Sequence, residues 1–400
     1  MNFTMLPFTL QLEDRPLAID LHDLAAHFAT LPDQRGRRGR RYPLPLLLTV
    51  AVLAKLAGYS QLREVADWAS LRQVELTRLL GFPRSTLPHP TTWSRVFASA
   101  CDPAQVAAAV QAFFAPRQTR PRPGHHLRVS IDGKTLTGTI PLGQTQGVHL
   151  VAAYLPAAGV VVAQLAVPDK ANELTVTPTL LMEVPLAGCV VTGDAMFAQR
   201  NLSAQIVAAE GDYIWTVKKN QAELYDDIAW LFAPLRPDER VADFDFQTAE
   251  TVDKGHGRLE ERTLRVSSLL KGYSTWPGLE QVFELTSHVT DGQGRTTTSV
   301  RYGVTSLSAA AARPERLLAL IRGHWQQENG LHYRRDVTLG EDRSQVRMGQ
   351  APQVLASLNN LVIGLATRHK QPNLAAWQRR VAYLFEKALQ RGPTATQTGA

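Results

Sequence analysis

The chain has 400 residues, of which 44% are hydrophobic and 20% charged, a composition that is ordinary for a globular protein and excludes a mainly disordered chain. Its formal net charge is +7, which favours a polyanionic partner without identifying one, because many basic proteins are merely soluble. The two cysteines, Cys101 and Cys189, stand apart in apolar surroundings, which excludes a disulfide framework and a cysteine zinc site and indicates a reducing compartment.

Neither an export signal nor a membrane span is predicted. The N-terminus lacks a basic region followed by an apolar one, and its early charges are largely acidic. The most apolar stretch, residues 43–56, is shorter than the roughly 20 residues that a span needs. We therefore expect a cytoplasmic protein with no membrane partner.

Residues 19–116 show apolar side chains at helical spacing, interrupted by breakers such as Pro32, Gly58 and Pro90. This pattern predicts an all-helical N-terminal domain, which we place at residues 1–120. A short helix, turn and helix over residues 81–94 fits a DNA reader, although such helical pairs are also common in plain bundles.

Arginines gather in two places that could follow a phosphate backbone. The run QRGRRGRR holds the first group: Arg35, Arg37, Arg38, Arg40 and Arg41. A plausible linker at residues 117–126 lies beside the second group: Arg117, Arg120, Arg122 and Arg128. A solvated face is the alternative reading of both.

After residue 126 the period of the apolar residues changes from helical to alternating, which predicts the order β-β-β-α-β-α-β over residues 127–217. Asp132 ends the first strand, in LRVSIDGK, and Asp194 ends the fourth, in GCVVTGD. Polar residues just past the ends of interior strands sit where ligands meet an α/β sheet. Both aspartates are therefore candidates for chemistry.

The rest of the chain alternates between helical and strand-rich patterns. A helix is expected at residues 221–232, a β-rich insertion at about 236–305, helices at about 308–335 and 351–369, and a disordered tail at the end. We assign residues 121–370 to a catalytic domain that contains the insertion, and residues 371–400 to a C-terminal helix and tail.

Glu328 shares a helical face with an unusual set of side chains: Ile321, His324, Trp325, Leu331, His332 and Arg335. A buried carboxylate is costly, so Glu328 either pairs with these bases or binds a cation. With Asp132 and Asp194 at the same sheet edge, three acids would raise one another's pKa unless a cation neutralised them. Oxygen ligands favour Mg²⁺ or Mn²⁺, and a pair of such ions supports phosphoryl transfer.

An ordered series of motifs now carries a resemblance over about residues 30–370: GRRYPLPLLLTVAVLAKLAG, SIDGKTLTGT, HLVAAY, TGDAMFAQR, DYIWTVKKNQ, HGRLEERTLRV and RGHWQQENGLHYRRDVTLGEDRSQVR. In these the chain resembles DDE transposases of the IS4-like group, and most closely the ISAs1 (H-repeat-associated) family. The resemblance implies a ribonuclease-H-like mixed sheet with flanking helices, Mg²⁺ with Mn²⁺ as a substitute, and cut-and-paste or related DNA transposition. It also implies a homo-oligomer on element ends and target DNA, in a prokaryotic cytoplasm at the nucleoid.

Carried onto this chain, the catalytic and metal-binding triad would be Asp132 in IDGK, Asp194 in TGDA and Glu328 in QQEN. Asp132 would be shared by both ions. Where the broad IS4-like signature has Tyr, Arg, Glu and Lys, this chain has Ile321, His324, Glu328 and Arg335. The basic role therefore falls to Arg322, His324 and Arg335.

Further DNA contacts are expected along the same motifs. Lys219 replaces the glycine of a VKGNQ motif, and we interpret Lys218, Lys219 and Asn220 as strand contacts. Lys134 is expected to meet the scissile phosphate and Arg258 a backbone phosphate, although each also fits an ordinary surface residue. Two alternatives to transposition stay open: a metal nuclease that does not join strands, and a domesticated copy that binds DNA without catalysis.

Overall fold

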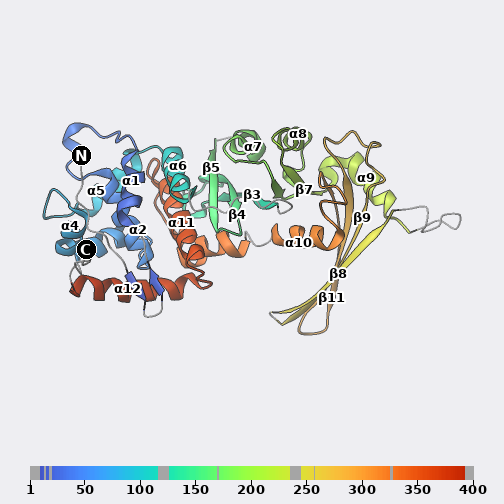
Figure 1. Ribbon diagram of the computed structural model, residues 1–400. Coiled ribbons are helices and arrows are strands. Elements are labelled where there is room, and N and C mark those ends of the chain that lie inside the picture. Colours follow the sequence, from blue (N-terminus) through green and yellow to red (C-terminus); the bar gives the residue numbers. More distant parts are fainter. Residues whose placement is uncertain are drawn as a thin grey trace, which may run out of the picture.

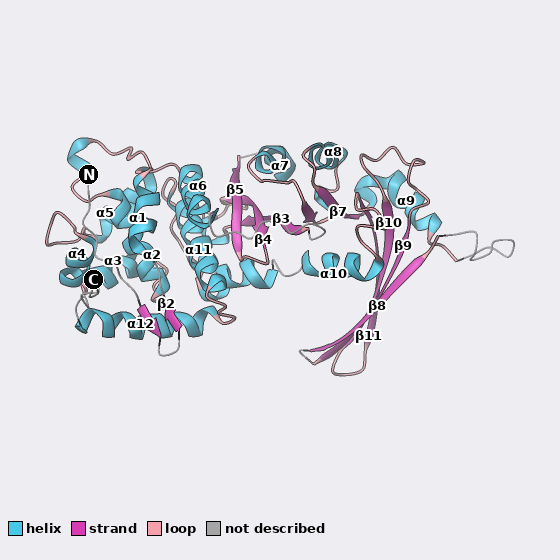
Figure 2. Ribbon diagram, viewed as in Figure 1, coloured by secondary structure: helices cyan, strands magenta, loops and turns pink. Residues whose placement is uncertain are grey.

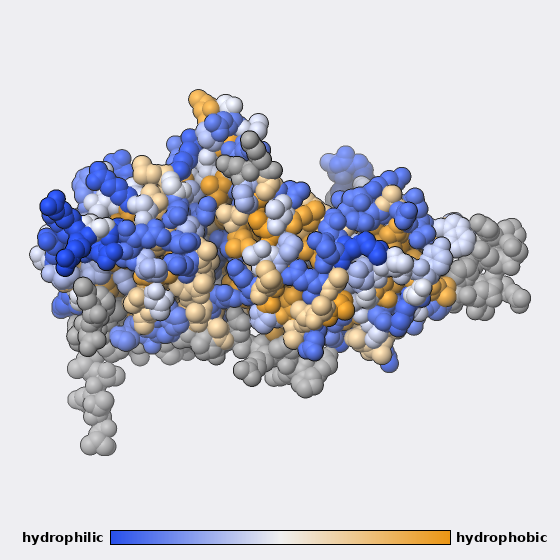
Figure 3. All heavy atoms as spheres, turned by 90° about the horizontal axis from the view of Figure 1, so that it is seen from above, coloured by the Kyte–Doolittle hydropathy of each residue, from blue (hydrophilic) through white to orange (hydrophobic). Residues whose placement is uncertain are grey.

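The computed structural model describes residues 10–12, 15–17, 20–115, 126–168, 171–234, 245–255, 257–324 and 328–391, without the side chains of residues 10–12, 15–17, 328–329 and 386–391. The expected linker and tail lie largely outside these residues. The described chain is elongated, with helices at one end and strands at the other (Figure 1). Hydrophilic residues prevail at both ends, and hydrophobic ones gather over the middle when the molecule is seen from above (Figure 3).

The first helices of the chain form one end of the molecule: α1 (Leu21–Ala29), α2 (Leu44–Leu56), α3 (Leu62–Ser70), α4 (Gln73–Leu80), α5 (Pro90–Ser99) and α6 (Pro103–Phe114). Side-chain caps fix several of their starts, for example Asp20 for α1 and Asp102 for α6. Two C-terminal helices, α11 (Ala351–Arg368) and α12 (Leu374–Arg391), return to pack here (Figure 2).

The connection between α4 and α5 does not match a short helix-turn-helix. Gly81 ends α4 in the left-handed conformation, with a φ of 63°. Residues 81–89 then separate the two helices, a longer connection than the three or four residues of that motif. The inward face of α5, including Trp93 and Phe97, is buried in the helical core.

Strands of the described chain form one mixed sheet of nine, in the order β5-β4-β3-β6-β7-β11-β10-β9-β8. The first five in the chain are β3 (Leu127–Thr135), β4 (His149–Leu155), β5 (Val160–Val167), β6 (Cys189–Gly193) and β7 (Asp212–Val217). The other four are β8 (Gln247–Gly255), β9 (Arg258–Ser267), β10 (Gln281–Thr290) and β11 (Thr296–Thr305). A separate two-stranded sheet pairs β1 (Leu10–Leu12) with β2 (Arg15–Leu17).

The predicted order of elements over residues 127–217 is present, with α7 (Glu173–Met182) and α8 (Arg200–Ala208) between the strands. β3, β6 and β7 are parallel to one another, whereas β4 and β5 follow β3 as an antiparallel meander. The later strands do not form a detached unit, because β11 pairs directly with β7 and so extends the same sheet.

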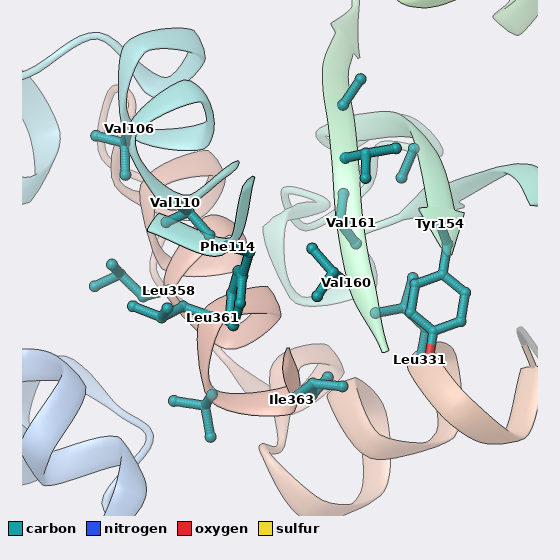
Figure 4. Close-up of a cluster of buried hydrophobic side chains, with 14 of the residues drawn as sticks. Val106, Val110, Phe114, Tyr154, Val160, Val161, Leu331, Leu358, Leu361 and Ile363 are labelled. Carbon is teal, nitrogen blue, oxygen red and sulfur yellow. The ribbon is translucent and has the colours of Figure 1, made fainter. Parts of the chain in front are cut away.

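Helices cover the two faces of this sheet. α7 and α8 lie on one face, and α10 (Pro314–His324) lies on the other, while α9 (Ala222–Leu231) packs near β10 and β11 (Figure 1). The edge strand β5 is covered by α6 and α11, whose side chains meet it in a dense apolar cluster (Figure 4). Among the described residues, no helix combines the length and apolar character needed to cross a membrane.

Candidate active site

The neighbouring strands β3 and β6 bring Asp132 and Asp194 to one cavity. Asp132 does not end its strand as predicted, because β3 continues to Thr135 in its pairing with β4, whereas Asp194 directly follows β6. In the parallel pair β3 and β6, Ser130 is opposite Thr192, and their hydroxyls lie 3.2 Å apart. Each aspartate follows two residues later, so both point to the same face of neighbouring strands, which lie about 5 Å apart. Asp132 and Asp194 both line one cavity of about 320 Å³.

The wall of this cavity comes from elements far apart in the sequence. It is lined by Asp132, Thr192, Gly193, Asp194, Ala195, Ile214, Thr216, Lys218, Phe283, Leu285, Arg301, Ile321 and His324. The carboxylates lie at the core strands, whereas Phe283, Leu285 and Arg301 come from β10 and β11. No local motif in the sequence marks these three residues, because only the extended sheet brings them to the aspartates.

The residues after each aspartate hold its carboxylate. Asp132 Oδ1 accepts from the amide of Gly133 at 2.9 Å, and Asp194 Oδ1 accepts from the amide of Met196 at 3.0 Å. Gly133 leaves room for Glu173, since an added Cβ would lie 2.1 Å from the Glu173 carboxylate. The Glu173 carboxylate therefore packs directly against the backbone of Gly133, next to Asp132.

Glu328 lies in η7 (Glu328–His332), a π-helical segment that follows α10. Its side chain is not among those that the structure describes, so its predicted place beside the aspartates stays a prediction. His332 ends this segment, and its Nδ1 lies 3.6 Å from Asp132 Oδ2. The backbone of Glu328 is therefore about one helical turn from a side chain that reaches Asp132.

Two histidines flank the carboxylates. His324 lines the cavity, with Nδ1 3.3 Å from the Thr192 hydroxyl. Burial lowers the pKa of His324 to about 4, against the opposing charge of Asp194. Burial, helped by Arg335 and Lys134, lowers the pKa of His332 to about 3. Both imidazoles are therefore neutral near pH 7 and leave the aspartate charges to another partner.

Lys134 and Arg335, two of the predicted DNA contacts, form ion pairs within the protein. Lys134 is 10% exposed, and its Nζ lies 2.6 Å from Asp336 and 3.3 Å from Asp342. Arg335 is 1% exposed, and its Nε donates to Glu341 at 2.7 Å. Both cations therefore have carboxylate partners within the protein, Arg335 in the interior and Lys134 at a partly buried position, and their roles as DNA contacts stay predictions.

The side chain of Asn220 also forms a hydrogen bond within the protein. Its side-chain amide donates to the carbonyl of Ala195 at 2.8 Å, and the next residue, Gln221, donates to the carbonyl of Ala198 at 3.0 Å. These bonds hold the turn that follows Asp194. Lys218 lines the cavity and Lys219 is exposed, so both keep a surface that a phosphate can reach.

Arg322 links the helix α10 to the later strands. Its Nη2 lies 2.5 Å from Asp253 on β8, and Arg262 of β9 reaches the same carboxylate at 2.7 Å. Arg322 is 36% exposed, so one side of it stays open to solvent. Arg258, at the start of β9, is exposed.

The arginine run at residues 35–41 divides into two kinds. Arg35 pairs with Asp33 at 2.6 Å, and Arg40 donates to the carbonyls of Arg35 and Asp33. These two therefore shape the loop itself. The other three side chains of the run are exposed: Arg37, Arg38 and Arg41.

The donor chemistry of the cavity suits a hard cation. Asp132 and Asp194 offer carboxylate oxygens, which Mg²⁺ and Mn²⁺ prefer. Among the residues that the structure describes, no three His, Cys, Asp or Glu side chains are grouped closely enough to hold a metal ion. A complete site therefore needs a further ligand, and the predicted one is Glu328.

Comparison with known proteins gives concordant results. A family model described as "Transposase DDE domain" matches residues 123–365, and one described as "DDE_Tnp_1-associated" matches residues 25–114. The "H repeat-associated putative transposase YhhI" of Escherichia coli (strain K12) is 25% identical over 360 residues, which cover 88% of this chain and 92% of that protein. The "Putative transposase YncI" of Escherichia coli O157:H7 is 26% identical over 354 residues, which cover 87% and 88%.

A solved structure, a piggyBac transposase synaptic complex with hairpin DNA, is similar at a TM-score of 0.43 and 9% identity, covering 94% of this chain and 80% of that one.

Proposed function

The chain belongs to the DDE transposase family, and we propose that it cleaves DNA strands at the ends of an insertion sequence and joins the freed ends to target DNA. The observation that carries this proposal is the pair Asp132 and Asp194 in one cavity, with Lys218 and Arg301 in its wall. Phosphoryl transfer requires carboxylates that bind metal cations, and next to them cationic side chains that bind the phosphate.

Mg²⁺, with Mn²⁺ as a substitute, is the cofactor that family membership implies. Asp132, Asp194 and Glu328 would hold it. When bound, such ions neutralise charge on the phosphate and lower the pKa of a water molecule. The neutral His324 and His332 supply no competing charge to the carboxylates.

The chain's own residues orient the DNA. Lys218 and Arg301 attract the scissile phosphate, and the apolar side chains of Phe283 and Leu285 limit water at that wall. Water attacks the phosphorus and breaks the bond to the 3′-oxygen, which leaves as a 3′-hydroxyl. That hydroxyl then attacks a phosphodiester of the target DNA and displaces its 3′-oxygen, so no covalent bond to the protein forms.

We also propose the finer organisation. Residues 121–370 form a ribonuclease-H-like catalytic domain with a β-rich insertion at about 236–305. Residues 1–120 form a helical domain that contributes DNA contacts, and residues 371–400 form a C-terminal segment that begins with the helix α12. The protein acts as a homo-oligomer on paired element ends at the nucleoid.

A strand-transfer assay tests the activity. The full chain is incubated with Mg²⁺, a plasmid target and a duplex that carries the inverted repeat flanking the gene, with a free 3′-hydroxyl. A joined product is the expected result. Cleavage without joining would identify a nuclease, and binding without either reaction would identify a DNA-binding protein that lacks catalysis; either result would overturn the proposal.

A further inference from the structure

Two glycines flank Glu328, and each lies against a side chain from the sheet. Gly323 is in the last turn of α10 and Gly330 is in η7. Both lie on the face of the sheet that α10 covers. Because neither glycine has a Cβ, the backbone of the helical segment lies close to these two side chains.

Arg128 of β3 occupies the space beside Gly323. A Cβ added to Gly323 would lie 1.2 Å from Nη1 of Arg128 and 2.2 Å from its Cζ. The guanidinium therefore lies directly on the bare backbone of α10. Arg128 is partly buried there, so it is not one of the surface arginines that its place in the basic sequence 117–128 suggested.

Tyr154 of β4 makes the corresponding contact with Gly330. A Cβ added to Gly330 would lie 2.9 Å from the Tyr154 hydroxyl oxygen. The ring of Tyr154 is buried and points toward the helical segment that contains Leu331 (Figure 4). A second side chain of the sheet thus supports the segment, on the other side of Glu328.

The two supports belong to one surface. Tyr154 is opposite Ser130 in the β3–β4 register, and Arg128 is two residues before Ser130 on the same face. Asp132 is two residues after Ser130, so Arg128 lies about 13 Å from it along the strand. Arg128 is not among the residues that line the cavity of Asp132 and Asp194, so it would act through the helix and not on the phosphate.

We infer that Arg128 is a positioning residue, which sets the height and angle of the segment bearing Glu328 over Asp132 and Asp194 through its contact with Gly323. Tyr154 gives the second support at Gly330. This inference rests on the proposed function, because it takes Glu328 as a member of the catalytic triad. It adds a structural reason for two glycines and one arginine that lie outside that triad.

The test is a double-mutant cycle in the full chain with the variants R128A, G323A and R128A/G323A. Removing the guanidinium, or displacing it with a methyl group, should lower the single-turnover cleavage rate at saturating DNA by about tenfold to a hundredfold. The effects should not add, so the double variant should match R128A within about twofold. The concentration of Mn²⁺ that gives half-maximal cleavage should rise in all three, while the Kd for DNA stays unchanged.

R128K should recover part of the rate, because it keeps the charge but lacks the planar fork. R316A is the matched control: Arg316 is at the opposite end of α10, where it donates to the carbonyl of Ala311, and its removal should leave the rate and the Mn²⁺ dependence unchanged. Thermal unfolding of each variant separates misfolding from mispositioning, since misfolding lowers Tm and DNA affinity together.

Two outcomes would overturn the inference: a fully active R128A, or rate reductions that multiply in the double variant. E328Q in the same assay separates this inference from the proposed function. An active E328Q would remove Glu328 from the triad, whereas an inactive E328Q beside an active R128A would remove only the role of Arg128.

Discussion

Lys55 is a charged side chain in the interior, where α2 meets α11. It is 1% exposed, and its Nζ donates to the carbonyl of Ser60 at 3.0 Å and to Asn359 at 2.8 Å. Asn359 in turn donates to Glu341, the partner of Arg335. A single buried polar network therefore joins the N-terminal helices to the segment that follows Glu328.

This network predicts a pH dependence of stability. Burial lowers the pKa of Lys55 from 10.5 to about 8 in the folded chain. Between these values the unfolded chain binds more protons, so stability should rise with pH from 8 to 10.5, by roughly 3 kcal/mol. Urea unfolding of the wild type and of K55M across this range measures the effect. Parallel pH profiles for the two proteins would contradict it.

At the level of residues, the sequence is sufficient to predict where the two aspartates lie, and it is insufficient to predict what the cationic side chains contact. Asp132 and Asp194 can be predicted to meet because they belong to successive strands of one α/β pattern, although β3 continues past Asp132 to Thr135. Lys134 and Arg335 cannot be assigned from sequence, because their partners, such as Asp336 and Glu341, are fixed by helical turns whose geometry only the structure provides. A position near a motif therefore does not distinguish a DNA contact from an internal ion pair.

At the level of elements, the turn after Asp194 depends on the start of the helical segment that follows β7. Asn220 and Gln221 donate to the carbonyls of Ala195 and Ala198, which are the first and last residues of that turn. Lys219, between β7 and these amides, is exposed. Neighbouring residues of one motif thus have separate tasks.

Paired variants distinguish these tasks. N220A should lower the cleavage rate at saturating DNA about tenfold, because it removes a hydrogen bond from the turn that holds Asp194, and should leave the Kd for DNA unchanged. K219A should weaken DNA binding and reduce its salt slope by about one, with little change in the saturated rate. Rate and filter-binding measurements on both variants check this, and a reversed pattern would contradict it.

Two features of these elements cannot be predicted from the sequence. The alternating pattern predicts a β-rich insertion, but β11 pairs with β7 and so brings Phe283 and Arg301 into the cavity wall. The spacing over 308–335 predicts regular helix, but the segment becomes π-helical at Glu328–His332. The spacing of apolar residues predicts which face of a strand or helix is buried. It does not predict which strand lies next to it in the sheet, or where an α-helix changes to a π-helix.

At the level of the whole molecule, the arginine run joins α1 to α2 at the helical end, whereas the strands β7 and β11, which supply residues of the cavity wall, lie toward the other end (Figure 1). Arg37, Arg38 and Arg41 have exposed side chains, whereas Arg35 and Arg40 bond within their own loop. Binding of a long DNA along the molecule would use the first three and not the other two.

R37Q/R38Q/R41Q should therefore make the salt dependence of DNA binding shallower, by up to about 0.9 in the logarithmic slope for each phosphate that the variant no longer neutralises. R35Q/R40Q is the matched control: it should lower Tm through the loop with a smaller change in slope. Binding titrations at several salt concentrations test this prediction. Equal slopes for the wild type and the triple variant would show that these arginines are solvated surface residues that do not contact DNA.

The central claim is that Asp132, Asp194 and Glu328 act together on DNA. Its most direct measurement is the rate of Mg²⁺-dependent strand cleavage by D132N, D194N and E328Q, with D226N on the exposed face of α9 as the control. Each triad variant should cleave at least about a thousandfold more slowly while binding DNA like the wild type, and D226N should cleave normally. Cleavage at the wild-type rate by any one of the three would contradict the account.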